Sequence, residues 1–299
     1  MDNITHTLVG AALAEAGLKK RTALGTATLM IGANFPDIDV VSVPFAISLT
    51  IRRGATHGVL ALAVLPFVLA GIMWLWDSRV RRRRDPTLPP ADFRQLTLLS
   101  AIAIATHPVL DFMNTYGMRW LMPFVNRWFY ADGLFIIDPW VLLALAVGVT
   151  WSRRANNPRP ARFTLVAASA YIVMMLTVTS VGRSQVEFAL NPTRFMVEPT
   201  PLVPWKRGVL VEEATAYRFG SWSLLGELAL DGGTLAKGDS DPAVALAKQT
   251  LAAQRFLKWS RFPFYRVVRE GGTTLVRIAD ARYIGEVAKG WAAVEVRLP

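Results

Sequence analysis

The stretch that decides the fold is Asn34-Phe35-Pro36-Asp37-Ile38-Asp39. It follows directly on an apolar, glycine-containing run, residues 23–33. Two carboxylates at the boundary of an apolar segment need cations or hydrogen-bond donors beside them, because an isolated charge is costly there. A turn with a helix cap also explains the pattern Pro-Asp-x-Asp, and this stretch alone favours neither interpretation.

The chain has three histidines, His6, His57 and His107, and each lies at an end of an apolar run. His107 and Asp111 are four residues apart, so on a helix they share a face as two ligands of one metal would. Imidazole and carboxylate groups together suit divalent metals. Pro108 predicts a helix start or a kink at residues 107–108. Each residue alone also fits a purely structural role, as a helix cap or an interfacial side chain. Because all three histidines and the acids lie at the ends of apolar runs, we predict one metal site. Its ligands are His6, Asp37, Asp39, His57, His107 and Asp111.

Composition indicates a membrane protein. Of the 299 residues, 53% are hydrophobic, and the mean hydropathy is +0.33. These values are too apolar for an ordinary soluble domain. The chain has no cysteine, which excludes disulfides, a thiolate nucleophile and Cys-based zinc sites.

The net charge of +11 fits an anionic membrane surface or a nucleic acid. The arginines of residues 79–84 follow directly on Trp74-Leu75-Trp76, which favours membrane anchoring.

We predict a mainly α membrane domain over residues 1–182. It begins with a short helical hairpin, residues 4–18 and 22–34, which is too short to cross a hydrocarbon core of about 30 Å. Four full spans follow, at residues 55–77, 95–112, 134–151 and 162–182. An aromatic loop, residues 116–130, lies between the second and third spans and is typical of a membrane interface.

Loop charge predicts the orientation. Loops 19–21, 78–94 and 152–162 hold thirteen Lys and Arg residues, whereas loops 34–56 and 113–133 hold four. The basic loops therefore belong in the cytoplasm of a bacterial inner membrane, with a multi-pass topology. The same orientation places all three histidines, the two aspartates of residues 34–39, Asp111 and Asp138 at the outer face.

Residues 183–299 are predicted to form a small extracytoplasmic α+β domain. Strand-like runs occur at residues 208–214, 215–225, 264–270, 273–279 and 291–298, and Gly271-Gly272 predicts a hairpin turn. Residues 241–259 have the pattern of one amphipathic helix that starts at Asp241-Pro242.

Several motifs together resemble a known family. They are Met1-Asp2-Asn3-Ile4-Thr5-His6, residues 34–39, Arg53-Gly54-Ala55-Thr56-His57, residues 107–111, Asn114-Thr115-Tyr116-Gly117, Asp138-Pro139 and residues 199–205. Over about residues 1–205 the chain resembles the bacterial inner-membrane metal-dependent hydrolases of the YdjM-like group, which is also described as LexA-binding. The resemblance implies a class of protein and no particular reaction.

A more distant resemblance is to zinc-dependent phospholipase C and the P1-type nucleases. Their order of ligands corresponds here to His6, Asp37 or Asp39, His57, His107 and Asp111. Those enzymes use further histidines downstream, which this chain lacks. One or two divalent ions, with zinc as the expected metal, are therefore predicted instead of three, and Asp138 is available to replace one ligand.

Roles can be assigned on this basis. Asp37 is the predicted base that serves a metal-bound water, and Arg53 is predicted to hold an anionic group of the substrate, unless it anchors a lipid headgroup. Asn34, Asn114 and Asp138 are predicted to support the ligands or the substrate. Trp205 fits either the site or the aromatic belt.

The leading function is hydrolysis of a lipid or lipid-linked phosphoester at the outer face of the membrane. A metal-dependent peptidase or amidase is less favoured because His-Glu-x-x-His is absent. A metal or ion transporter is disfavoured because the charged groups gather at one face. A regulatory protein that binds a cytoplasmic partner through the arginines of residues 79–84 is the remaining alternative. No nucleic acid is expected at the site.

Overall fold

The structure, a computed structural model, describes residues 1–45, 52–290 and 292–298. It divides into two compact units, each described here by itself. The helical unit comprises Met1–Val178 and Pro199–Pro204, and the C-terminal unit comprises Thr179–Glu198 and Trp205–Pro299. This boundary and the predicted one after residue 182 both lie within helix α8 (Arg159–Leu190).

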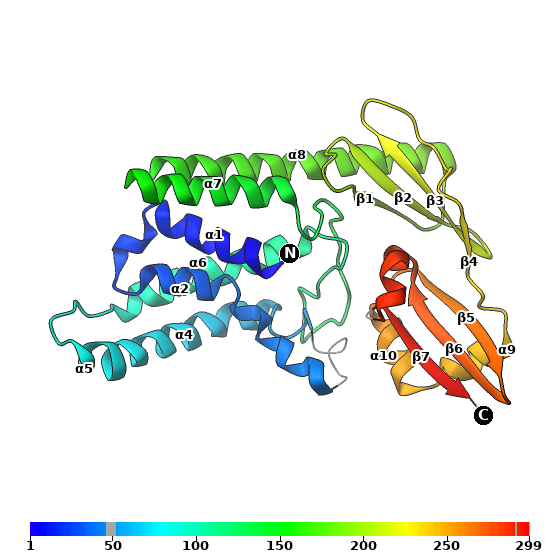
Figure 1. The fold of residues 1–299 in the computed structure, drawn as a ribbon, viewed down its shortest axis with the longest axis horizontal. Helices are drawn as coiled ribbons and strands as arrows, with labels where there is room; N and C mark the ends of the chain where they lie inside the picture. Colours follow the sequence, from blue (N-terminus) through cyan, green and yellow to red (C-terminus); the bar gives the residue numbers. More distant parts are fainter. Residues whose placement is uncertain (46–51, 291, 299) are drawn as a thin grey trace. The chain divides into compact units, whose positions relative to one another are not determined.

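The helical unit is a row of packed helices. Its main helices are α1 (Asn3–Glu15), α2 (Gly25–Gly32), α4 (Val59–Trp76), α6 (Phe93–Phe112), α7 (Pro139–Ala155) and the first part of α8. Short helical turns connect them: η1 (Leu18–Arg21), η2 (Phe35–Phe45), η3 (Asp77–Arg81) and α5 (Arg82–Arg84). Helix α4 packs on α6, α6 on α2, α2 on α1, and α1 on α7 (Figure 1).

Glycines let the central helices approach closely. A Cβ atom built on Gly10 of α1 would lie 2.5 Å from the carbonyl oxygen of Leu29 in α2. One built on Gly32 would lie 2.8 Å from the Cβ of Ala103 in α6. Such contacts exclude a larger residue. Helices α1, α2 and α6 are thereby held close together, and predicted site residues lie at the start of α1, just after α2 and at the end of α6.

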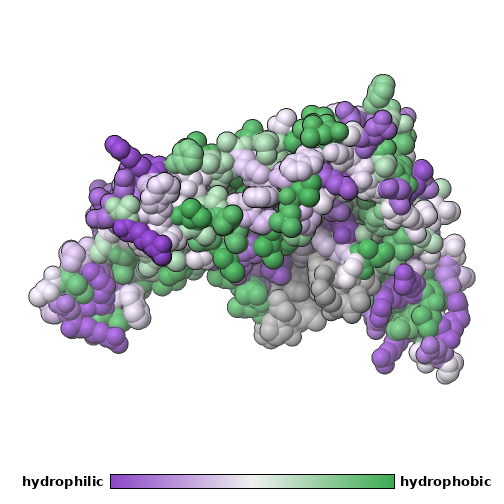
Figure 2. All heavy atoms as spheres, turned by 45° about the horizontal axis from the view of Figure 1, so that its top comes forward, coloured by the Kyte–Doolittle hydropathy of each residue, from purple (hydrophilic) through white to green (hydrophobic). Residues whose placement is uncertain are grey.

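Within the residues that the structure describes, three helices are long and apolar enough to cross a membrane: Val59–Arg84, Phe93–Phe112 and Arg159–Leu190. They match three of the four predicted spans. The remaining one, residues 134–151, corresponds to α7, whose 17 residues extend about 26 Å. The count of four spans therefore stays a prediction. Large apolar side chains such as Phe67 and Val166 are more than half exposed on these helices, as expected of surfaces that face lipid (Figure 2).

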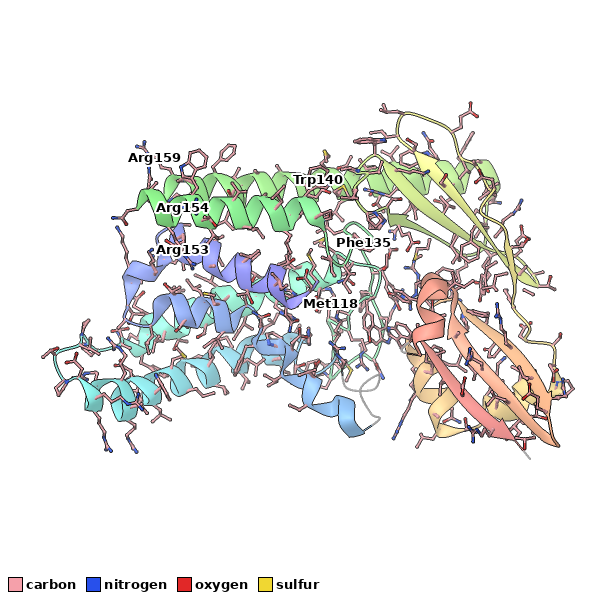
Figure 3. The ribbon with its side chains drawn as sticks, viewed as in Figure 1. Met118, Phe135, Trp140, Arg153, Arg154 and Arg159 are labelled. Carbon is pink, nitrogen blue, oxygen red and sulfur yellow. The ribbon has the colours of Figure 1, made fainter. Side chains whose placement is uncertain are left out.

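The two ends of the helical unit differ chemically. Arg153, Arg154 and Arg159 lie at one end, and Met118, Phe135 and Trp140 lie at the other (Figure 3). An arginine-rich end opposite an aromatic end is the arrangement that the loop charges predicted. Which end faces the cytoplasm stays a prediction.

The C-terminal unit contains two antiparallel sheets. The first has the order β1-β2-β3-β4, formed by Phe195–Pro199, Lys206–Glu212, Ala216–Ser223 and Thr234–Ala236. The second has the order β5-β6-β7, formed by Pro263–Glu270, Thr273–Asp280 and Ala293–Leu298. Gly271 and Gly272 adopt φ values of 55° and 81° between β5 and β6, which confirms the predicted hairpin turn. The predicted strands correspond to β2, β3, β5, β6 and β7, whereas β1 and β4 were not predicted.

The single helix predicted at residues 241–259 is wrong. Two helices, α9 (Pro242–Ala247) and α10 (Leu251–Trp259), occupy this segment. The Thr250 hydroxyl accepts a hydrogen bond from the Ala253 N–H and caps α10. A threonine at this position favours a new helix start over continuation, and the apolar periodicity concealed it.

Candidate metal centre

Helix α6 supplies His107 and Asp111. The helix runs through Pro108 to Phe112, so the predicted start at residues 107–108 does not occur, and the two side chains share a face as predicted. The Nε2 of His107 lies 3.4 Å from Oδ2 of Asp111. The Nδ1 of His107 donates to the carbonyl oxygen of Ala33 at 2.7 Å. A carbonyl only accepts, so Nδ1 carries a proton, and Nε2 is the nitrogen that the neutral form of the ring would present to a metal.

The loop before α4 supplies His57. The His57 N–H donates to the Gly54 carbonyl at 2.9 Å, which turns the chain just before the helix. Arg119, from the aromatic loop, supports this turn, because its N–H donates to the Arg53 carbonyl at 3.0 Å and its guanidinium to the Arg52 carbonyl at 2.8 Å. The position of His57 therefore depends on two segments that are far apart in sequence.

The η2 turn supplies Asp37 and Asp39, which point in different directions. A 3₁₀ helix has three residues per turn, so positions two apart lie on different faces. Oδ1 of Asp37 lies 3.6 Å from Nε2 of both His57 and His107. Oδ2 of Asp39 instead accepts from the Arg53 N–H at 2.9 Å and the Thr56 hydroxyl at 3.1 Å, and it lies 3.5 Å from Nδ1 of His57.

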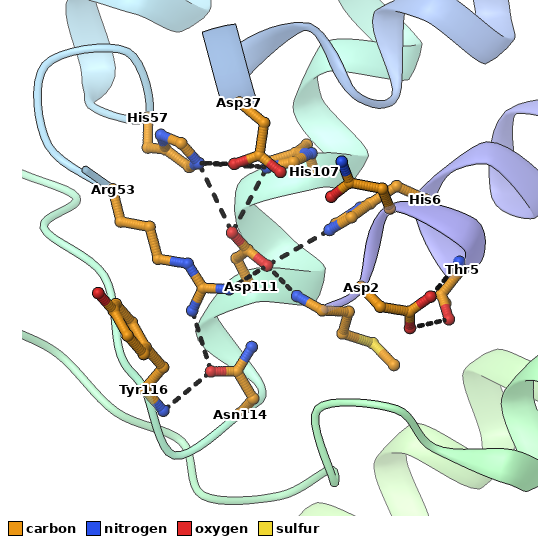
Figure 4. A network of polar contacts seen from close by, with 12 residues as sticks. Asp2, Thr5, His6, Asp37, Arg53, His57, His107, Asp111, Asn114 and Tyr116 are labelled. Carbon is orange, nitrogen blue, oxygen red and sulfur yellow. Dashed lines mark hydrogen bonds and ion pairs between the residues drawn. The ribbon is translucent and has the colours of Figure 1, made fainter. Parts of the chain in front are cut away.

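Four atoms from three segments converge on one point: Nε2 of His57, Nε2 of His107, Oδ1 of Asp37 and Oδ2 of Asp111 (Figure 4). The two Nε2 atoms are 3.1 Å apart. The carboxylate oxygens lie 3.4 to 3.6 Å from these nitrogens. Ligand bonds of about 2.05 Å in a tetrahedral zinc site place the ligand atoms about 3.3 Å from one another. Five of the six distances among the four atoms are therefore close to the edges of such a tetrahedron, and the sixth, between the carboxylate oxygens of Asp37 and Asp111, is at most 4.8 Å.

A bound cation would also stabilise the buried polar atoms of this group. Oδ2 of Asp111 is buried and has no hydrogen-bond partner in the part of the chain that the structure describes. An unpaired buried carboxylate oxygen is costly, as is the close approach of two imidazole lone pairs. A divalent ion among these four atoms satisfies all of them.

A second set of contacts holds the other oxygen of Asp111. Its Oδ1 accepts from the Arg53 guanidinium at 3.0 Å and also contacts the amino group of Met1. The same guanidinium donates to Oδ1 of Asn114 at 3.0 Å and to the Gly117 carbonyl at 3.2 Å, and it lies over the Tyr116 ring. The Arg53 side chain is only 7% exposed. Arg53 is therefore engaged with the protein itself, next to a metal ligand.

His6 lies beside the four ligand atoms. Asp2 caps α1 by accepting from the N–H groups of Ile4 and Thr5, and this start of the helix places His6 inside the unit. The His6 ring stacks on His107 with centroids 3.9 Å apart, and its Nε2 lies 3.3 Å from Oδ1 of Asp111. The structure thus brings His6 to the site without placing it among the four ligand atoms.

The other predicted residues have different surroundings. The Asn34 side-chain amide donates to the Thr7 hydroxyl and to the Met30 carbonyl. Asp138 caps α7 and accepts from the Tyr171 hydroxyl. Trp205 belongs to the C-terminal unit and is half exposed.

Three supporting residues were given no role from the sequence: Thr56, Tyr116 and Arg119. Thr56 directly precedes His57, and its hydroxyl lies 3.0 Å from Nδ1 of that ring. Its place in the sequence was a usable signal, because the second nitrogen of a ligand histidine needs a partner. Tyr116 and Arg119 act through contacts between distant segments, which no local pattern indicates.

Comparison with known proteins gives a family model and a distant relative. A family model described as "YdjM inner membrane protein" matches residues 1–181. The chain is 27% identical over 162 residues to the uncharacterized protein YfhP of Bacillus subtilis (strain 168). That alignment covers 50% of this chain and 46% of YfhP, so the chain spans about half the length of this relative. No solved structure matches the chain. None of these findings shows the distant resemblance to zinc-dependent phospholipase C and P1 nuclease, which stays a prediction.

Proposed function

Because the chain belongs to the YdjM inner membrane protein family, we propose that it is a membrane-embedded, metal-dependent hydrolase. We propose as its substrate a lipid or lipid-linked phosphoester, and the outer face of the membrane as the place of reaction. The observation that carries the proposal is the convergence of ligand atoms from Asp37, His57, His107 and Asp111, at the end of the helical unit where α6 leads into the aromatic loop. A site at that end is beside the headgroups of the lipids.

The metal supplies chemistry that these side chains lack. A bound divalent ion polarises a phosphoryl oxygen and lowers the pKa of water to about 7. Zinc is the proposed metal, because two imidazoles and two carboxylates in a tetrahedron suit it. One ion fits the four atoms.

The protein's own residues orient the site and handle the proton. Asp37 is the most accessible of the four ligands, with a side chain 13% exposed, whereas the others are at most 1% exposed. Its carboxylate has two oxygens, so one can face the metal while the other accepts a proton from the attacking water. Asp39 faces Nδ1 of His57, the ring nitrogen that points away from the four ligand atoms. Arg53 donates to Oδ1 of Asp111, the oxygen that is not among them.

Other functions fit the arrangement less well. A transporter needs polar groups along a path through the membrane, and α4, a candidate span, has no charged residue between Val59 and Trp76. A peptidase or amidase would use the same metal chemistry, and a substrate panel separates it from a phosphoesterase. A regulatory role through the arginines of residues 79–84 requires no chemistry at the site.

The test compares Asp37→Asn with His57→Ala in detergent at neutral pH. Metal content is measured beside hydrolysis of a panel of phospholipids, phosphodiesters, acyl esters and peptides. We expect Asp37→Asn to bind the metal more weakly but to be loaded at excess zinc, and to lose about 100-fold in rate even when loaded, because Asn keeps one ligand oxygen but cannot accept a proton. His57→Ala should lose metal and activity together. A wild-type protein with a full complement of metal that hydrolyses nothing in the panel would contradict the proposal.

A further inference from the structure

A groove lies on the surface of the helical unit where α1, α2 and η2 meet. Its volume is about 460 Å³, and it is lined by Thr7, Met30, Ile31, Asn34, Phe35 and Ile38. This size is within the range of pockets that hold small molecules. The lining has no charged side chain, and its two polar members are bonded to each other, because the Asn34 amide donates to the Thr7 hydroxyl at 2.9 Å. The groove is therefore suited to an apolar occupant.

The groove adjoins η2, the turn that also carries Asp37 of the metal centre. Phe35 and Ile38 are three residues apart in this turn and share the face that lines the groove, whereas Asp37 lies on an adjacent face of the same turn. The Asn34 carbonyl accepts from the Asp37 N–H at 3.0 Å, while the Asn34 side chain lines the groove. Asp37 is also the most exposed of the four candidate ligands. A molecule in the groove therefore lies against the turn that carries the most exposed ligand.

The surroundings of the groove are those of a lipid-facing surface. Ile31 and Ile38 of its lining are 45% and 43% exposed, and Ile4, one helical turn from Thr7 on α1, is 65% exposed. A peptide would bring backbone N–H and C=O groups that need partners, and this lining offers few. A hydrocarbon chain needs none.

We propose that this groove binds one acyl chain of the lipid substrate and thereby places the headgroup ester beside Asp37. That the bound lipid is the substrate rests on the proposed function. The groove accounts for recognition of the apolar part of the molecule, and the metal centre accounts for the polar part.

The test is photo-crosslinking of the full-length protein in nanodiscs. The probe is a phosphatidylethanolamine that carries a diazirine in one acyl chain, and the adducts are mapped by mass spectrometry. We expect adducts at Met30, Ile31, Phe35 and Ile38 in excess over those at Phe67, a more exposed apolar position on α4. Ile31→Trp, which fills the groove, should lower the adducts at the other groove positions by about tenfold.

Ile72→Trp on α4 is the matched control, because Ile72 is 50% exposed and lies outside the groove. Ile38→Trp, in η2, is the second test variant, and metal content shows whether each variant has folded. Equal labelling of the groove and of Phe67, or unchanged labelling in both groove variants, would overturn the proposal. Groove labelling with no hydrolysis of any substrate would support the groove and contradict the proposed hydrolase.

Discussion

At the scale of residues, Asp37 and Asp39 differ in what they contact although they are two positions apart. Asp37 faces the two Nε2 atoms, whereas Asp39 faces the opposite side of His57. A carboxylate behind a ligand histidine fixes the orientation of the ring and raises its basicity. The sequence predicted both aspartates as metal ligands, since it does not show which face of a short 3₁₀ turn meets the histidines.

Asp39→Asn should weaken metal binding without removing it. The amide keeps an acceptor for the Arg53 N–H, so the loop stays in place, but the negative charge behind His57 is lost. We expect the affinity for Zn²⁺ to fall about 10- to 100-fold. Competition with a chelating dye measures this affinity. The control is Asp85→Asn, at a carboxylate that accepts a hydrogen bond from the Thr87 hydroxyl. An affinity equal to that of the wild type would rule out the orienting role of Asp39.

Arg53→Lys should lower both metal content and stability. A lysine cannot reproduce the fork of bonds to Asp111, Asn114 and the Gly117 carbonyl. Because lysine keeps the charge but leaves buried acceptors unsatisfied, we expect a loss of about 1–3 kcal/mol. Thermal unfolding and metal analysis measure the effect, with Arg52→Lys on the same loop as control. If Arg53→Lys instead raises KM and leaves both properties unchanged, the predicted contact with substrate is the better account of Arg53.

At the scale of elements, the approach of α1 to α2 sets the shape of the site. Gly10→Ala places a methyl group against the Leu29 backbone, a contact that the helices can relieve only by separating. We expect a loss of about 1–3 kcal/mol and a lower unfolding temperature. Gly71→Ala in α4 is the matched control, because nothing lies within 4 Å of the new methyl group. The control should be neutral or gain about 0.5–1 kcal/mol, and equal effects of the two changes would contradict the close packing.

The elements also show which features local sequence patterns predict and which they do not. Gly271-Gly272 predicted its hairpin correctly because the turn demands positive φ values, which is a local requirement. The segment at residues 241–259 was predicted wrongly because apolar periodicity continues across the cap at Thr250. The pairing of His107 with Asp111 was predictable from spacing, whereas the packing of Arg119 against the Arg52-Arg53 loop depends on contacts over more than sixty residues.

At the scale of the whole molecule, the orientation predicted from loop charge can be tested directly. The chain has no cysteine, so Arg83→Cys and Ser240→Cys each introduce a single reactive thiol. We expect an impermeant maleimide to label residue 240 in cells with a permeable outer layer and an intact inner membrane, and to leave residue 83 unlabelled. Labelling of residue 83 alone would reverse the orientation, and labelling of both would refute the predicted topology.

The central claim is that Asp37, His57, His107 and Asp111 hold a metal ion in the membrane. The most direct measurement is elemental analysis of purified wild-type protein beside His57→Ala and His107→Ala. The geometry predicts about one zinc ion per wild-type chain and almost none in either variant, with the helical content of all three proteins unchanged. A wild-type protein that carries no stoichiometric divalent metal, even after incubation with zinc, would contradict the claim, and so would variants that retain the metal.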